Sequence, residues 1–276
     1  MRTTTAAAAV LALAFTVAGC GGAHHRDAAP GTHPTATATG TGAAKPPAAD
    51  ADSAAAKAVV TMVDRAETMH SVRTVSVQRR GSSTVTMTTI GSWGGADAGL
   101  VVTASPAAFG FQGANHHDRM ETRFVHGFEY LQIDPPASGP NKGKTWLRFP
   151  LASVAPRGSM GFLSEAMDYS PVHGLLMMPS SGPVTLVGHE TVDGRPAVHY
   201  RGTKPADAAI VKAQRVPATQ QIDVWVGADG LPVRMVSDDG KLRVTEDFID
   251  FGGVVHIQVP PASQTVVPPA PRPSTA

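Results

Sequence analysis

The sequence has a single cysteine, few aromatic residues and little charge. Its 276 residues include 23 Lys and Arg against 22 Asp and Glu, and charged residues make up 16% of the chain. Because so even a balance gives no strong positive field, we expect no nucleic-acid partner that depends on phosphate neutralisation. One cysteine excludes an intrachain disulfide, and it excludes zinc or iron–sulfur sites built from several cysteines.

Motifs for catalysis are missing as well. Residues 138–145 resemble a phosphate loop, but Ser138 replaces the first glycine and a strand pattern follows, so we interpret them as a turn. His116-His117-Asp118 lacks the spacing of a tight metal site and is interpreted as a surface loop. No Gly-x-Ser-x-Gly elbow occurs in the sequence. We therefore expect no enzyme, no catalytic residue, no metal site and no cofactor.

The first twenty residues have the pattern of a bacterial lipoprotein signal. Arg2 precedes an uncharged apolar stretch over residues 6–18, shorter than the roughly 20 residues that a spanning helix needs. The stretch ends in the tetrapeptide VAGC at residues 17–20, which resembles the lipobox. That resemblance implies that residues 1–19 are a signal peptide and that the Cys20 thiol takes a diacylglyceryl group.

Several acyl chains on one residue hold a protein stably on a membrane. We therefore expect a lipid anchor at Cys20 on the extracytoplasmic face of the cell membrane. The alternative is an ordinary secretory signal in which Cys20 is incidental. The position of the only cysteine, directly after the apolar stretch, argues against it.

Three regions follow the signal. Residues 20–52 hold the lipidated cysteine and then a stretch rich in Ala, Thr and Pro without large apolar side chains, which predicts a disordered tether. Residues 263–276 are rich in proline and predict a disordered tail. Between them, residues 53–262 predict one folded domain.

The domain pattern is a helix followed by strands. Apolar residues at helical spacing predict a helix that begins at Ser53 and ends near Met69. Period-two patterns then predict strands, with turns at His126-Gly127, Asp193-Gly194, Asp229-Gly230 and Asp239-Gly240. Antiparallel strands with few helices predict a mainly β, α+β fold with a strongly curved sheet. The strands are expected around residues 75–77, 85–89, 100–103, 119–125, 128–133, 145–149, 184–189, 197–202, 221–226, 232–237, 241–247 and 254–259.

A second helical stretch over residues 161–178 interrupts the strands, and Pro171 and Gly174 predict that it is broken. A shorter helix is expected over residues 206–214. The first stretch is rich in methionine, whose flexible side chain adapts to varied apolar surfaces. Two interpretations stay open: a helix packed into the core, or a lid over a lipid cavity. As a lid, its ligand contacts are Met160, Phe162, Leu163, Met167, Leu175, Leu176, Met177 and Met178.

The order of these elements carries a family resemblance. The strand end Trp146–Pro150, the hairpins at residues 188–200 and 224–234, and the closing segments 247–252 and 257–260 resemble the actinobacterial LppX/LprA/LprF/LprG lipoproteins. The fold of that family is similar to the LolA and LolB lipoprotein carriers. The resemblance covers residues 53–262. It implies an antiparallel half-barrel closed by helices on its concave face, around an apolar cavity that binds acylated lipids or glycolipids.

Two functions are compatible with these patterns. The first is a membrane-anchored exported lipoprotein that binds or transfers an acylated lipid or glycolipid in an apolar cavity. The second is a surface-anchored protein-interaction module with a filled core and no ligand. The membrane, through Cys20, is the expected partner in both, and no particular protein partner is indicated.

Overall fold

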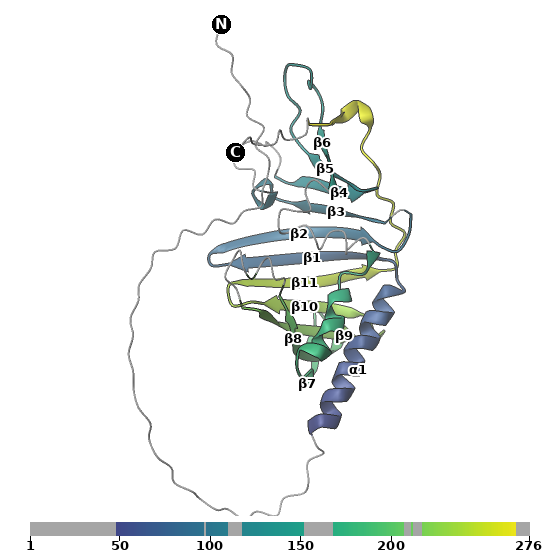
Figure 1. Ribbon diagram of the computed structural model, residues 1–276, viewed down its shortest axis with the longest axis vertical. Helices are drawn as coiled ribbons and strands as arrows, with labels where there is room; N and C mark the ends of the chain where they lie inside the picture. Colours follow the sequence, from purple (N-terminus) through teal and green to yellow (C-terminus); the bar gives the residue numbers. More distant parts are fainter. Residues whose placement is uncertain are drawn as a thin grey trace, which may run out of the picture.

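The strands of the computed structural model form one open sheet (Figure 1). The structure describes residues 48–96, 98–109, 118–151, 168–206, 211 and 217–268. The twelve strands lie in the order β12-β6-β5-β4-β3-β2-β1-β11-β10-β9-β8-β7, so the two edge strands, β12 and β7, do not pair with each other. The sheet curves into a half-barrel, and the predicted mainly β fold class is confirmed.

The helices and strands have the following bounds. They are α1 (Ala48–Glu67), β1 (Ser71–Arg80), β2 (Ser83–Ser92), β3 (Gly99–Ala104), η1 (Pro106–Phe109), β4 (Met120–Val125), β5 (Phe128–Gln132), β6 (Trp146–Pro150), η3 (His173–Met177), α4 (Met178–Ser181), β7 (Thr185–Val192), β8 (Arg195–Pro205), β9 (Thr219–Gly227), β10 (Pro232–Asp238), β11 (Leu242–Phe251), η4 (Ala262–Gln264) and β12 (Thr265–Val266).

Two antiparallel meanders meet at the centre of the sheet. Strands β1 to β6 pair each with the next, and so do β7 to β11. The first and the last long strands, β1 and β11, pair antiparallel along their lengths and join the halves. Only β12 pairs in parallel, with β6, among the described strands. The N-terminal and C-terminal parts of the domain therefore depend on each other for a complete sheet.

Helix α1 covers the half of the sheet that contains β7 to β11 (Figure 1). Its apolar residues Ala55, Val59, Met62, Val63 and Ala66 are all buried and recur at helical spacing. They therefore form one continuous stripe against the sheet. The helix begins at Ala48, five residues before the predicted start, so the end of the predicted tether is helical.

The hairpin turns lie where the sequence predicts them. His126 and Gly127 have φ values of 51° and 76°, and Asp193 and Gly194 have values of 50° and 79°. Two successive residues with positive φ make the tight hairpin turn whose twist matches that of the flanking strands. The predicted turns at Gly230 and Gly240 also have positive φ at the glycine. Residues 140–143 form a turn before β6, as expected for residues 138–145.

Two segments differ from the sequence-based expectation. Residues 254–259 are not a strand, because Ile257 packs with Val125, Tyr130 and Trp146 on the face opposite α1. The side chain of Arg123 holds this segment by donating to the Gln258 carbonyl oxygen at 2.6 Å. The chain then forms η4 and β12, which extends the sheet at β6. Residues 263–266, expected in the disordered tail, therefore belong to the folded domain.

The predicted helical stretch over residues 161–178 is broken where the structure describes it. A short 3-10 helix, η3, follows Pro171 and contains Gly174, and the four-residue helix α4 continues from it. Residues 161–167, and residues 207–210 and 212–214 of the shorter predicted helix, lie outside the described residues.

Candidate functional site

Strand register defines a face of the sheet that we call the helix side. Val72 on β1 and Phe248 on β11 pack into the core with α1, so residues paired with them point the same way. Two rows of paired residues cross β2 to β6 on this side. Row one is Gly91, Leu100, Phe124, Glu129 and Phe149, and row two is Thr89, Val102, Thr122, Leu131 and Leu147.

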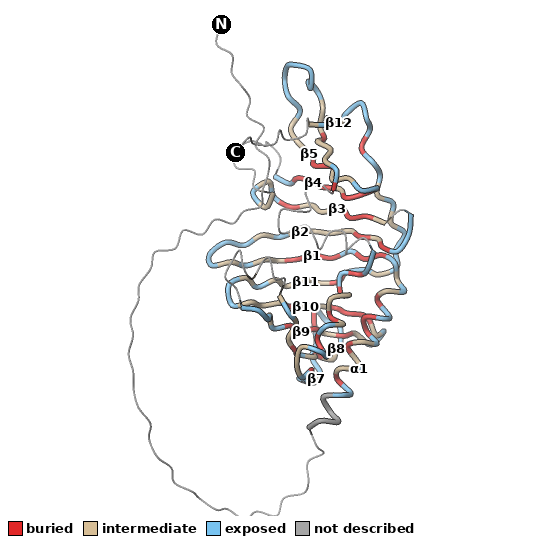
Figure 2. Tube along the Cα trace, in the orientation of Figure 1, coloured by how far each residue is buried: buried red, intermediate tan, exposed pale blue. Residues whose placement is uncertain are grey.

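The two halves of the helix side are filled differently. Over β7 to β11 and β1, the helices α1, η3 and α4 pack into one continuous core. No described helix packs in this way on rows one and two, yet Leu100, Phe124 and Leu131 are buried. Figure 2 shows the buried positions, in red, continuing into β3, β4 and β5. Within the described part of the chain, rows one and two are thus a mainly apolar surface outside the core that α1, η3 and α4 form.

Among the described strand residues, two with carboxyl groups point to the helix side. Glu129 stands in row one, directly between Phe124 and Phe149. Burial raises its pKa from 4.5 to about 7, because an ionised carboxylate is poorly solvated there. Glu246 lies on β11 opposite Ser76 and Met235, and burial raises its pKa too. Carboxyl groups with raised pKa values among apolar side chains mark a candidate binding region.

One buried hydroxyl group among the described residues of rows one and two has no hydrogen-bond partner. It is Oγ1 of Thr122, in row two. Thr122 is almost completely buried. Since buried hydroxyl groups are normally hydrogen-bonded, this one is a donor and acceptor available to another molecule.

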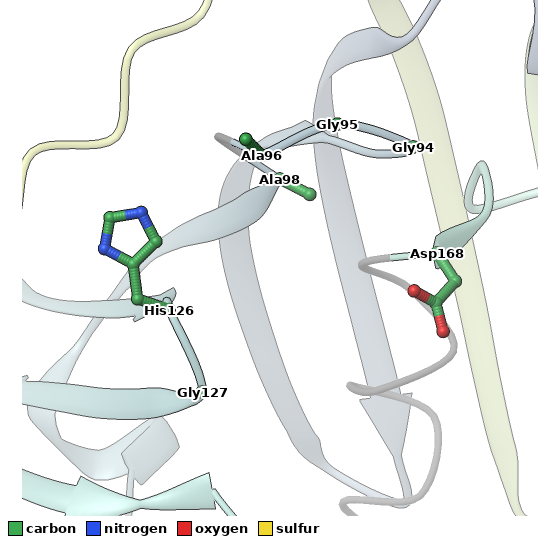
Figure 3. A pocket seen from close by; sticks show the side chains of 7 residues that line it. All are labelled: Gly94, Gly95, Ala96, Ala98, His126, Gly127 and Asp168. Atoms are coloured by element: carbon green, nitrogen blue, oxygen red, sulfur yellow. The ribbon is translucent and has the colours of Figure 1, made fainter.

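A pocket of about 520 Å³ lies next to row one, at the strand ends that the β2–β3 loop and the β4–β5 turn connect (Figure 3). Its walls come from the β2–β3 loop, the β4–β5 turn and Asp168. His126 and Asp168 lie on opposite sides of it, and the remaining lining residues are the glycines and alanines Gly94, Gly95, Ala96, Ala98 and Gly127. The small side chains leave backbone groups accessible. The pocket therefore offers polar contacts beside an apolar surface.

A polar cluster lies on the opposite face of β7 to β9. The Nδ1 atom of His199 is 2.8 Å from Glu190 Oε1, and its Nε2 atom is 2.7 Å from Asp223 Oδ1. The imidazole ring thus lies between two carboxylates, with each ring nitrogen within hydrogen-bond distance of one of them. Arg201 donates to Asp223 at 2.6 Å, and Trp225 stacks on His199 and donates to Glu190 at 2.7 Å. Every polar group here has a partner, as expected of a structural cluster.

The structure places only some of the predicted ligand contacts. Leu175 and Met178 are 1% and 0% exposed and lie in the core with α1. Leu176 packs partly buried against that core, and Met177 is 49% exposed. Met160, Phe162, Leu163 and Met167 lie outside the described residues, as does Cys20.

Sequence reasoning missed the polar residues of both faces. Glu129 and Thr122 fall inside predicted strands, and the signal was present as polar residues at alternating positions among apolar ones. His199 and Asp223 also lie in predicted strands. Their meeting depends on the pairing of β8 with β9, which the sequence alone does not specify.

Two further observations concern the described part of the chain. It holds no group of three or more His, Cys, Asp or Glu side chains arranged to bind a metal ion. None of its helices is both long and apolar enough to cross a membrane.

No family model matches the sequence. An uncharacterised protein of Streptomyces griseus is 26% identical over 202 residues, which span 64% of this chain and 66% of that protein. A Streptomyces coelicolor protein named as a lipoprotein is 27% identical over 153 residues, 53% of this chain and 50% of its own length. The chain thus spans less than two thirds of the length of either relative.

Among solved structures, LprF from Mycobacterium bovis aligns with a TM-score of 0.50 and 16% sequence identity, covering 75% of this chain and 97% of LprF. The chain has the LprF fold. The resemblance that the order of elements indicates is confirmed at the level of the fold.

Proposed function

We propose that this protein is an exported lipoprotein, anchored through Cys20, that binds an acylated lipid on the helix side of β2 to β6. The observation that carries the proposal is the apolar surface of rows one and two, which no described helix packs against. The LprF fold and the relative named as a lipoprotein support it. The proposal includes two further points: the anchor lies on the extracytoplasmic face of the membrane, and the domain can transfer the lipid that it binds.

The mechanism is passive partition. An acyl chain that leaves water for rows one and two gains about 0.8 kcal/mol for each buried methylene group. The pocket lined by His126 and Asp168, at the strand ends beside row one, provides polar contacts for the headgroup. The tether keeps the domain close to its membrane, so the lipid travels only a short distance.

The predicted ligand contacts fit this proposal unequally. Leu175 and Met178 stabilise the core beneath α1, so they support the domain without forming the binding surface. Met160, Phe162, Leu163, Met167, Leu176 and Met177 stay proposed contacts. The helix-filled half of the sheet supports the alternative of a ligand-free interaction module. Such a module gives no reason for the half-buried Glu129 in row one.

The test is lipid extraction from residues 21–276, expressed in an actinobacterium and purified without detergent. This form keeps the whole described domain and omits the anchor. We expect organic extraction and mass spectrometry to recover a stoichiometric acylated lipid, and native mass spectrometry to show the same adduct on the folded protein. Protein that is folded and free of lipid would contradict the proposal.

A matched pair of variants locates the site. Val102 is in row two, whereas its neighbour Val101 points to the opposite face, towards Ile90 and Arg123. Val102→Trp places a large side chain on the binding surface, so we expect at least a tenfold loss of bound lipid. Val101→Trp adds the same volume on the other face and keeps the lipid. Equal occupancy in the two variants would show that rows one and two are not the site.

A further inference from the structure

Glu129 and Thr122 are diagonal neighbours on the helix side. Glu129 pairs with Phe124 across β4 and β5, and Thr122 lies two residues before Phe124 on β4. Diagonal neighbours on one face of antiparallel strands are about 7–8 Å apart. That spacing leaves room for one small polar group between the carboxyl and the hydroxyl.

The surroundings of this pair are apolar. The positions that flank Glu129 are Phe124 and Phe149, and those that flank Thr122 are Val102 and Leu131. The charged residues of β4 and β6, which are Glu121, Arg123 and Arg148, alternate onto the opposite face. Among the described strand residues, the other carboxyl on the helix side is Glu246, which lies on β11, five strands away from β5 in the sheet. Asp168 and His126 are the titratable groups of the neighbouring pocket.

Neither polar group is used within the described structure. The Thr122 hydroxyl is buried and has no hydrogen-bond partner. Among the described residues no side chain bonds to the Glu129 carboxyl. An apolar side chain at either position would serve a filled core better, because a buried polar group without a partner costs free energy. A ligand that supplies the missing partner accounts for both.

We propose that Glu129 and Thr122 form a polar subsite that binds an ester carbonyl of the lipid, with Glu129 in its protonated form. This inference rests on the proposed function. A protonated carboxyl has one O–H to donate and the threonine hydroxyl has another. A carbonyl oxygen has two lone pairs and accepts both, while the acyl chain runs on along the apolar rows.

The subsite makes lipid binding dependent on pH. Since burial raises the pKa of Glu129 to about 7, the group keeps its proton below neutral pH and loses it above. The ionised form has no proton to donate and repels the carbonyl oxygen. Binding therefore weakens as the pH rises through about 7, and the lipid is released more readily under alkaline conditions.

The experiment is calorimetric titration of residues 21–276 with dioctanoylglycerol, an uncharged diester, after delipidation. Measurements at about pH 5.5 and about pH 8.5 bracket the raised pKa of Glu129. We expect the dissociation constant of the wild type to increase by at least about tenfold at the higher pH. Glu129→Gln keeps a donor that does not titrate, so its affinity stays the same at both values. Thr122→Val weakens binding by roughly threefold to tenfold at both.

Matched controls lie on the opposite face. Glu121→Gln, on β4, keeps the pH profile of the wild type, and Thr103→Val, on β3, keeps its affinity. Circular dichroism at each pH monitors folding. Binding that is independent of pH in the wild type, or still dependent on pH in Glu129→Gln, overturns the subsite and leaves the proposed function standing. Failure of every variant to bind dioctanoylglycerol, with no lipid in the organic extract, overturns both.

Discussion

Single residues on the two faces of the sheet have opposite electrostatic roles. On the helix side, Glu129 is isolated among apolar side chains, so burial favours its neutral form. On the other face, burial acts on Asp223 in the same direction. Hydrogen bonds from Gln221, Arg201 and His199 outweigh it and lower the pKa of Asp223. The first arrangement leaves a group free for a ligand, and the second pairs His199, Arg201, Glu190 and Asp223 with one another.

The Asp223 cluster gives a prediction for stability. Asp223→Asn leaves His199 and Arg201 without their shared anion, although the His199 and Asp223 side chains are only 5% and 7% exposed. We expect the free energy of unfolding at pH 7 to fall by about 3 kcal/mol, measured by urea denaturation. Because the folded state lowers the pKa of Asp223, its contribution is complete above the ordinary value of 3.8. The difference between wild type and variant therefore shrinks as the pH falls below about 4.

An exposed pair provides the control for this prediction. Asp193 accepts a hydrogen bond from Arg234 at 2.9 Å, but its side chain is 62% exposed. Asp193→Asn should change the free energy of unfolding by less than about 1 kcal/mol. A similar loss of unfolding free energy in both variants would mean that burial does not increase the contribution of the Asp223 cluster to stability.

Among the elements, hairpins were the most predictable. Segments that lie on a face of the sheet without pairing as strands were the least predictable. Turns such as Asp193-Gly194 follow from local backbone preference, so two or three residues determine them. Residues 254–259 alternate like a strand, but the alternation arises because Ile257 packs onto the face of the sheet while its neighbours point outward.

The candidate site was predictable from the sequence only as an apolar surface. The position of Glu129 beside Thr122 depends on long-range strand register, which a single sequence does not encode locally.

Within the short helix η3, a buried and an exposed side chain lie only two residues apart. Leu175 is buried beneath α1, whereas Met177 is 49% exposed. Leu175→Glu places a charge in that core and should lower the free energy of unfolding by about 3 kcal/mol or more. Met177→Glu should change it by less than about 0.5 kcal/mol. Thermal unfolding followed by circular dichroism compares the two.

The outcome for these variants also distinguishes the two interpretations of this stretch. A core element unfolds cooperatively with the sheet when Leu175 is replaced. A mobile lid would instead leave the sheet intact and lose only the lipid. Loss of lipid from Leu175→Glu without any loss of stability would contradict the packing that the structure shows.

At the scale of the whole molecule, the folded domain and the membrane anchor are separate in the sequence. The described domain begins at Ala48, and the predicted lipidation site is Cys20. The disordered tether that the composition predicts would, at that length, have an r.m.s. reach of roughly 30 Å, enough for the domain to rotate near the headgroups without leaving the membrane. A binding surface on the helix side can then meet the bilayer while the polar cluster faces away.

This separation gives the last prediction, which concerns Cys20. Cys20→Ala removes the only thiol that can take the diacylglyceryl group, so we expect no incorporation of labelled palmitate and a protein that no longer fractionates with membranes after release of its signal. The domain should still fold, because the described core begins at Ala55, far from Cys20 in the sequence. Gly21→Ala is the matched control, since it keeps the thiol and the small residues before it, and it should retain the label. A Cys20→Ala protein that is still labelled with palmitate and held on membranes would rule out the lipobox interpretation, and it would place the attachment of this domain in another part of the chain.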